Sequence, residues 1–409
     1  MTASVDRWAD VYRDIHAHPE LGFAETRTAG IVQSHLVSMG FEVATGVGGT
    51  GVVGLLRNGP GPLVLVRADM DALPVLEATG LPYASTQVST DAAGNQTPMM
   101  HACGHDLHVA CLLGACERLT ENRNTWSGTL MAVFQPAEEL GDGARAMIDD
   151  GLYARFGTPV VVLGQHVAPL PAGVIGLHVG AAFAAADSLM VTLHGQGAHG
   201  SRPEASVDPI VMAAATVLRV QTIVSREVPA GETAVVTIGT MHAGTAVNII
   251  PDRAELGFSI RTFSTDVRDQ VLAAIERIAR GEAATAGAPR PPDVGLSYSF
   301  PAVINEEAAC ARTRPALQSV SPAIIDPGPV TGSEDVGLLA SAAEAPCVYW
   351  LLGGADPAGF DGATTIGEIA ARSRDLPSNH SPMFAPVIEP TVSTGIEALT
   401  GAATIWLQR

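Results

Sequence analysis

The sequence predicts an α/β protein with a second, smaller α+β domain inserted into it. The chain has 409 residues, whereas single hydrophobic cores stop growing at roughly 250–300 residues. Strand-like apolar runs alternate with helical patterns in the first part of the chain, which is typical of a buried sheet covered by helices. The pattern changes to βαββαβ in the middle and returns to α/β alternation after Asn305.

The first part of the chain is expected to form the sheet and helices of the larger domain. Buried strands are expected at the apolar runs 51–56, 62–66, 129–134 and 159–163. Helices are expected at Val5–Ile15, Thr26–Met39 and Leu107–Leu119.

The middle of the chain is expected to form a self-contained antiparallel α+β domain over residues 185–302. Its strands are expected at 188–193, 233–241, 254–261 and 295–300, and its helices at 209–224 and 267–280. The larger domain then consists of residues 1–184 and 303–409.

The composition excludes several classes of function. The formal net charge is −19, and all 23 cationic side chains are arginines. Nucleic acids and anionic membranes bind basic patches, so neither is expected as a partner. The absence of lysine excludes catalysis by a lysine base or a Schiff base.

The N-terminal segment and the cysteines bear on the expected cellular compartment. The N-terminal segment has no apolar core of signal-peptide length, and no apolar run reaches the ~18 residues of a membrane-spanning helix. The odd number of cysteines, five, does not indicate a disulfide framework. We therefore expect a soluble, cytoplasmic protein.

Three of the predicted strands end in side chains that can carry chemistry. Asp69 follows the run 62–66, Glu138 and Glu139 follow 129–134, and His166 follows 159–163. Ligands bind at the carboxyl ends of strands in open α/β sheets. The sequence therefore predicts a site at this edge of the sheet.

A further cluster, His101-Ala-Cys103-Gly-His105-Asp106-Leu-His108, directly precedes an apolar helical segment. Thiolate, imidazole and carboxylate together are ligands for zinc, cobalt, nickel or manganese. The alternative for this segment is that histidines 101, 105 and 108, at helical spacing, form only the polar face of a helix.

The neighbouring glutamates 138 and 139 must point in different directions. One can bind a metal while the other acts as a base on water, whose pKa a bound ion lowers toward ~7. Taken alone, two adjacent glutamates after a strand are typical of the solvated start of a helix. Taken alone, His199 and His380 are typical of histidines in exposed loops. The prediction depends on the whole set.

A series of motifs from residue 13 to residue 384 carries a family resemblance: RDIHAHPELGFAET, RADMDALP, HACGHDLH, FQPAEE, GQHVAP, GQGAHGSRPEASVDP, AVNIIPD, GSEDV and SNHSPMF. The chain resembles the di-metal amidohydrolases of the carboxypeptidase-G and aminoacylase superfamily. It is most similar to the branch of hippurate hydrolases, bacterial N-acyl-amino-acid amidohydrolases and plant auxin-conjugate hydrolases.

The resemblance implies a mixed-sheet, metallopeptidase-like catalytic domain with an inserted lid and dimerisation domain. It implies a role for each matching residue. Metal ligands are Cys103, which bridges two ions, His105, Glu139, His166 and His380. Glu138 is the general base and acid, Asp69 supports the metal site from behind the ligands, and His199 stabilises the oxyanion in a partner subunit. Asn248 and Arg261 hold the carboxylate end of the substrate.

The implied reaction is hydrolysis of the amide bond of a small N-acyl amino acid, such as an acetyl or benzoyl conjugate. The implied cofactors are two divalent ions per subunit (zinc, manganese, cobalt or nickel), and the implied assembly is a homodimer or a dimer of dimers. A dipeptide or an aminobenzoyl-glutamate type of substrate is an alternative within the superfamily. Leu107 and Val336 depart from residues common in this branch, glycine and phenylalanine, which leaves the shape of the substrate pocket open.

Two interpretations from other classes remain. Cys103 could act as a nucleophile with His105 as its base and without metal, but Glu138, Glu139 and the two distant histidines would then have no role. A non-catalytic protein that binds a metal or an acyl amino acid would be expected to lack the base or a ligand. Here the base and all five ligand positions are filled.

Overall fold

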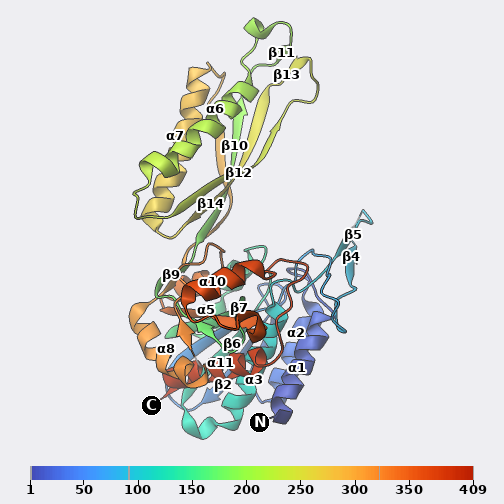
Figure 1. Ribbon diagram of the computed structural model, residues 1–409, viewed down its shortest axis with the longest axis vertical. Coiled ribbons are helices and arrows are strands. Elements are labelled where there is room, and N and C mark those ends of the chain that lie inside the picture. Colours follow the sequence, from blue (N-terminus) through green and yellow to red (C-terminus); the bar gives the residue numbers. More distant parts are fainter. Residues whose placement is uncertain (1, 91–92, 322, 409) are drawn as a thin grey trace. The chain divides into compact units, whose positions relative to one another are not determined.

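The computed structural model of the protein describes residues 2–90, 93–321 and 323–408 (Figure 1). The chain forms two compact units. Unit 1 consists of Met1–Ala182, Ile304–Pro329 and Asp335–Arg409, and unit 2 of Phe183–Val303 and Val330–Glu334. Within the described residues, no helix combines the length and apolar character needed to cross a membrane.

Unit 1 is built on a ten-stranded mixed sheet, which confirms the predicted fold class. Its main path runs β1-β2-β6-β3-β7-β18-β16-β9, and β8 and β17 pair beside it. Strands β6, β3, β7 and β18 are parallel, whereas β1, β2 and β6 pair antiparallel. The strands are β1 (Glu42–Val47), β2 (Gly51–Asn58), β3 (Leu63–Asp69), β6 (Gly128–Gln135), β7 (Val161–Pro171), β8 (Ile175–Gly176), β9 (Gly180–Phe183), β16 (Val303–Asn305), β17 (Ile324–Ile325) and β18 (Cys347–Ala355). Strands β4 (Val88–Thr90) and β5 (Gln96–Pro98) form a separate antiparallel pair.

Helices bury the faces of this sheet. On β6, the alternate residues Leu130, Ala132 and Phe134 belong to the main core, in which α3 and α11 pack on each other. The short helices α4 and α9 contact β6 and β7 and each other. The helices are α1 (Thr2–His16), α2 (Thr26–Ser38), α3 (His105–Glu121), α4 (Gly143–Asp149), α5 (Leu152–Phe156), α8 (Glu307–Val320), α9 (Val336–Ala342), α10 (Ile366–Asp375) and α11 (Thr391–Leu407).

Unit 2 contains a four-stranded antiparallel sheet in the order β12-β14-β10-β15, with α6 and α7 packed against it (Figure 1). Alternate residues of β14 are buried, as a sheet covered on one face requires. Both helices begin at a side-chain cap, Asp208 for α6 and Ser264 for α7. The elements are β10 (Ala185–His194), α6 (Pro209–Thr222), β12 (Ala234–Ala243), β14 (Arg253–Thr262), α7 (Thr265–Thr285) and β15 (Asp293–Phe300). Two short strands of the same unit, β11 (Ala198–His199) and β13 (Ile249–Ile250), form a separate antiparallel pair.

The topology of unit 1 brings the predicted site residues to one edge. Strands β6, β3 and β7 are adjacent and parallel, so their carboxyl ends lie together. Asp69 ends β3, and Glu138 and Glu139 follow β6. His166 is the central residue of β7, two residues beyond Gly164, where the pairing with β3 ends.

Candidate metal centre

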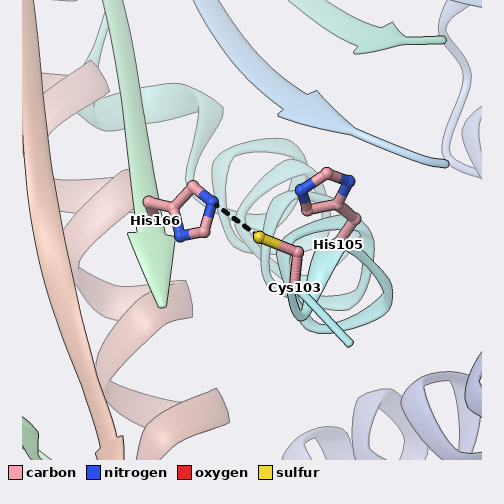
Figure 2. Close-up of side chains that lie close together, drawn as sticks. All are labelled: Cys103, His105 and His166. Atoms are coloured by element: carbon pink, nitrogen blue, oxygen red, sulfur yellow. Dashed lines mark hydrogen bonds between the residues drawn. The ribbon is translucent and has the colours of Figure 1, made fainter. Parts of the chain in front are cut away.

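Cys103 and His105 lie on either side of Gly104 at the start of α3. Gly104 has a φ of +83°, and a Cβ placed there would lie 2.4 Å from Cγ1 of Val167. Only glycine fits this turn, because a side chain would be strained and would also clash. Figure 2 shows the result: Cys103 lies between His105 and His166, and its Sγ is 3.5 Å from Nε2 of His166.

Cys103 is shared by two groups of potential ligands. One group is Cys103, His105 and His166, and the other is Cys103, Glu139 and His380. Within each group the donor atoms lie within 4.8 Å of one another. Ligands at about 2.0–2.3 Å from a zinc ion are themselves about 3.3–3.8 Å apart in a tetrahedral site, so each group needs only small movements to enclose an ion. The structure thus brings together all five ligands predicted from the sequence.

Two hydrogen-bonded loops bring His380 to this position. The amide of His380 donates to the carbonyl of Ala102 at 2.8 Å. The side-chain amide of Asn379 donates to the carbonyl oxygens of Cys103 at 3.2 Å and of Val167 at 3.1 Å. His380 itself has a φ of +70°, a conformation that costs about 1–3 kcal/mol and that surrounding contacts must maintain.

Hydrogen bonds also fix which ring nitrogen of each buried histidine faces the site. Nδ1 of His105 donates to Oδ1 of Asp71 at 3.1 Å, and Nδ1 of His166 donates to the carbonyl of Val167 at 2.8 Å. In both rings Nε2 is therefore left with its lone pair for a metal. The other oxygen of Asp71 accepts the amide N–H of Glu139 at 2.9 Å.

Asp71 hydrogen-bonds to two residues of the site, although the sequence alone did not indicate a role for it. The available signal was its two-residue spacing from Asp69 in RADMD, which places both carboxylates on the same side of an extended segment. Asp69 itself is fully buried, accepts from Nη1 of Arg67 at 2.7 Å and lies 3.7 Å from Nε2 of His105.

Two buried acceptor atoms test whether the cluster suits a metal ion. Among the described residues, Nε2 of His105 and Oε1 of Glu139 make no hydrogen bond of good geometry and lie 3.9 Å from each other. Oε1 of Glu139 is also within ion-pair distance of Nε2 of His380, at 3.3 Å. Buried polar atoms in folded proteins are nearly always satisfied. A convergent set of lone pairs on nitrogen, oxygen and sulfur therefore fits a cation.

The electrostatics of Cys103 lead to the same conclusion. Burial raises the pKa of its thiol, and the negative charge of Glu139 raises it further. A thiolate at this position therefore requires a compensating positive charge, which a coordinated divalent ion supplies.

Glu138 lies in the cluster together with Glu139. Its side chain is largely buried, and its Oε2 is 3.9 Å from Nε2 of His105. Ala137, directly before it, has a φ of +48°, so the chain turns sharply where β6 leads into the two glutamates. Histidines 101, 105 and 108 are all buried, and they do not form the exposed polar helix face that was the alternative interpretation.

The three predicted residues of unit 2 do not lie together. His199 and Asn248 are neighbours, because the amide of Gly200 donates to the carbonyl of Asn248 at 2.8 Å. His199 and Arg253 line a hollow of about 910 Å³. Arg261 is eight residues further along β14 than Arg253, a separation of about 27 Å in a strand.

The exposed ring of His199 has a defined tautomer. The amide of Ser201 donates to its Nδ1 at 3.1 Å, so the ring proton is carried by Nε2. His199 can therefore offer an N–H donor from Nε2.

Comparison with known proteins gives matches over most of the chain. Residues 65–365 match the family model described as peptidase family M20/M25/M40. The N-acetyl-L-cysteine deacetylase of Bacillus subtilis is 36% identical over 331 residues, which is 80% of this chain and 75% of that protein. The hippurate hydrolase of Campylobacter jejuni is 42% identical over 273 residues, 66% of this chain and 68% of that protein.

A solved structure has the same fold over the whole length. A dinuclear metal-binding peptidase of Bacillus subtilis is 28% identical, covers 100% of this chain and 99% of its own, and superposes with a TM-score of 0.80.

Proposed function

Because the chain belongs to peptidase family M20/M25/M40, we propose that it is a di-metal hydrolase that cleaves the amide bond of N-acyl amino acids. The products are a carboxylic acid and a free amino acid. The observation that carries the proposal is the pair of three-ligand groups that share Cys103, with Glu138 beside them. Relatives named for N-acetylcysteine and hippurate cleavage support this substrate class.

Two divalent ions are the cofactors that fit these residues. Cys103, His105 and His166 would hold one ion, and Cys103, Glu139 and His380 the other. When bound, the ions polarise the amide carbonyl and acidify the attacking water.

We assign the proton transfers to Glu138, because its carboxylate lies at the site and belongs to neither of the two groups that contain Cys103, although it is within reach of His105 and Glu139. Glu138 takes a proton from the water as its oxygen bonds to the carbonyl carbon. It then gives this proton to the leaving nitrogen as the C–N bond breaks. The reaction therefore consumes one water per amide and leaves Glu138 unchanged.

The residues of unit 2 are assigned to substrate binding and to the oxyanion. Nε2–H of His199 is the donor for the oxyanion, and in a homodimer it would serve the partner subunit. Arg261 is assigned to the substrate carboxylate. Asn248 lies beside His199 and apart from Arg261 in the same subunit, so it would reach that carboxylate, like His199, from the partner subunit. A charged anchor is needed because the protein carries a net charge of −19, which repels an anionic substrate on average.

The proposal is tested by assaying metal-reconstituted protein on a panel of N-acetyl, N-benzoyl and N-indoleacetyl amino acids together with dipeptides, with released amine as the readout. Cleavage of N-acyl amino acids in preference to dipeptides is expected. The reverse preference would favour the alternative that the protein is a peptidase that cleaves dipeptides. Two relatives named as peptidases, the thermostable carboxypeptidases of Saccharolobus solfataricus, are 35% identical over 355 residues. Full activity after exhaustive chelation would contradict the metal mechanism and favour Cys103 as a nucleophile.

A further inference from the structure

His108 is a buried histidine at the metal centre to which the proposed reaction gives no role. It lies one helical turn after His105 on α3, and its side chain is 1% exposed. Its ring stacks on His105, with centroids 5.5 Å apart, and meets the ring of His166 edge-on at 4.7 Å. His108 therefore packs against two of the proposed ligands at once.

Two hydrogen bonds fix the protonation of this ring. The amide of Val167 can only donate, and it donates to Nε2 of His108 at 2.8 Å. The proton of the neutral ring is therefore on Nδ1, which donates to Oδ1 of Asp69 at 2.6 Å. Asp69, His105 and His108 lie close enough together to form a further group of potential ligands. We do not count His108 as a ligand, because both of its ring nitrogens already take part in hydrogen bonds.

The bond to Val167 replaces a missing strand contact. Strands β3 and β7 pair only as far as Arg67 and Gly164, so Val167 lies beyond the end of their ladder. His108 accepts from the amide of Val167, and the carbonyl of Val167 accepts Nδ1–H of His166. The main chain that orients His166 is thus held on one side by His108.

The bond to Asp69 fixes a carboxylate behind the ligands. One oxygen of Asp69 accepts from His108 and the other from Arg67, and both partners are buried. His108 therefore connects the end of β3 to the edge of β7, and its ring fills the space between His105 and His166.

We propose that His108 is a positioning residue of the metal centre, which couples Asp69 to the main chain of Val167 and so holds His105 and His166 in their ligand orientations. The inference rests on the proposed metal centre but not on the identity of the substrate.

Two substitutions separate the two bonds. In His108→Asn, the shorter amide can still donate to Asp69 but cannot reach Val167. In His108→Gln, the longer side chain can accept a hydrogen bond from the amide of Val167 but cannot donate to Asp69 as Nδ1 of His108 does. Leu112→Ala is the matched control, because Leu112 is buried one turn further along the same helix and belongs to the apolar core.

The experiment titrates metal-free protein with Co²⁺ against a competing chelator and records the thiolate-to-cobalt charge-transfer and d–d absorption bands. Both His108 variants should bind Co²⁺ more weakly by about 10–100-fold, the usual effect of removing a residue that orients ligands, with altered d–d bands. Leu112→Ala should lower the melting temperature but keep wild-type affinity and spectrum.

The outcomes distinguish this inference from the proposed function. A folded His108 variant that binds Co²⁺ as the wild type does would overturn the positioning role, and so would an equal loss of affinity in Leu112→Ala. If His108→Asn does not fold, His108→Gln decides by the same criterion. Failure of the wild-type protein to bind Co²⁺ would instead refute the proposed metal centre.

Discussion

Nδ1 of His105 donates to Oδ1 of Asp71 at 3.1 Å, and the second oxygen of the same carboxylate accepts the amide of Glu139. One carboxylate thus orients a ligand from each of the two three-ligand groups. We predict that Asp71→Ala lowers metal affinity by about 10–100-fold and therefore shifts the metal concentration needed for activity upward by the same factor. Isothermal titration with Zn²⁺ and steady-state kinetics over a range of metal concentrations would check this. Wild-type affinity in Asp71→Ala would show that the hydrogen bonds are not needed to orient the ligands.

Glu138→Gln should remove catalysis without removing metal. The amide cannot accept the proton of the attacking water, so kcat should fall by about 10²–10⁴-fold, the usual contribution of a general base. Metal content measured by mass spectrometry of the purified variant should stay at the wild-type value. An equal loss of metal would make Glu138 a ligand and would contradict its assignment as the base.

Replacing the shared ligand should have a larger effect on metal content than replacing a terminal one. Cys103→Ala removes a donor from both groups, whereas His380→Ala removes a donor only from the group with Glu139. We expect His380→Ala to retain one ion per subunit and Cys103→Ala to retain less than one, as counted by native mass spectrometry. Equal occupancy in the two variants would argue against a bridging thiolate.

His199 and Glu138 should complement each other if the active site is shared between subunits. His199→Ala and Glu138→Gln proteins are each expected to be nearly inactive. Mixed dimers should recover part of the activity, because one of the two sites then combines an intact His199 with an intact Glu138. Subunit exchange must first be shown with a mass-tagged protomer. No recovery after full exchange would contradict the shared site.

A buried ion pair between His16 and Asp106, the residue after His105 in α3, predicts a pH dependence of stability. Nδ1 of His16 lies 2.6 Å from Oδ2 of Asp106 and Nε2 lies 3.1 Å from Oε1 of Glu77. Burial alone would lower the pKa of His16, but the two carboxylates outweigh it and raise the pKa to about 10. The folded pKa is above the unfolded value of about 6.5, so the stabilisation is complete below about pH 6.5 and is lost as the pH rises through about 10.

The test compares His16→Gln with the wild type by urea unfolding of the metal-free proteins. At pH 6.5 the variant should be less stable by about 3–5 kcal/mol, as expected when one partner of a buried ion pair is removed. This difference should shrink toward pH 10. The nearby Tyr12 and Tyr83 both have a raised pKa and stay neutral over most of this range. A difference independent of pH would contradict a cationic His16.

Local sequence was sufficient to predict the edge of the sheet at which the site lies. Strands β3 and β6 are continuous apolar runs that end in polar side chains, so periodicity and topology rules place Asp69, Glu138 and Glu139 together. The alternation of helices and strands likewise predicted the α/β class.

The sequence did not show which side chains support the ligands. His105 and His108 have the spacing of a polar helix face, and only the packing of α3 against β3 and α11 shows that both are buried. The spacing of Asp69 and Asp71 does not indicate which carboxylate bonds to His105. His380 follows no periodic pattern, and its position depends on contacts with Ala102 and on those of Asn379 with Val167.

The loop contact between His380 and Ala102 also has a consequence for the order in which the centre is completed. Cys103, His105 and His166 leave the ribosome more than two hundred residues before His380 does, so a nascent chain can gather only the first of the two ligand groups. With the proposed ligands, the second ion would bind only after the loop that carries His380 has docked. It would then join Cys103 at the start of α3 to a residue 277 positions later in the sequence.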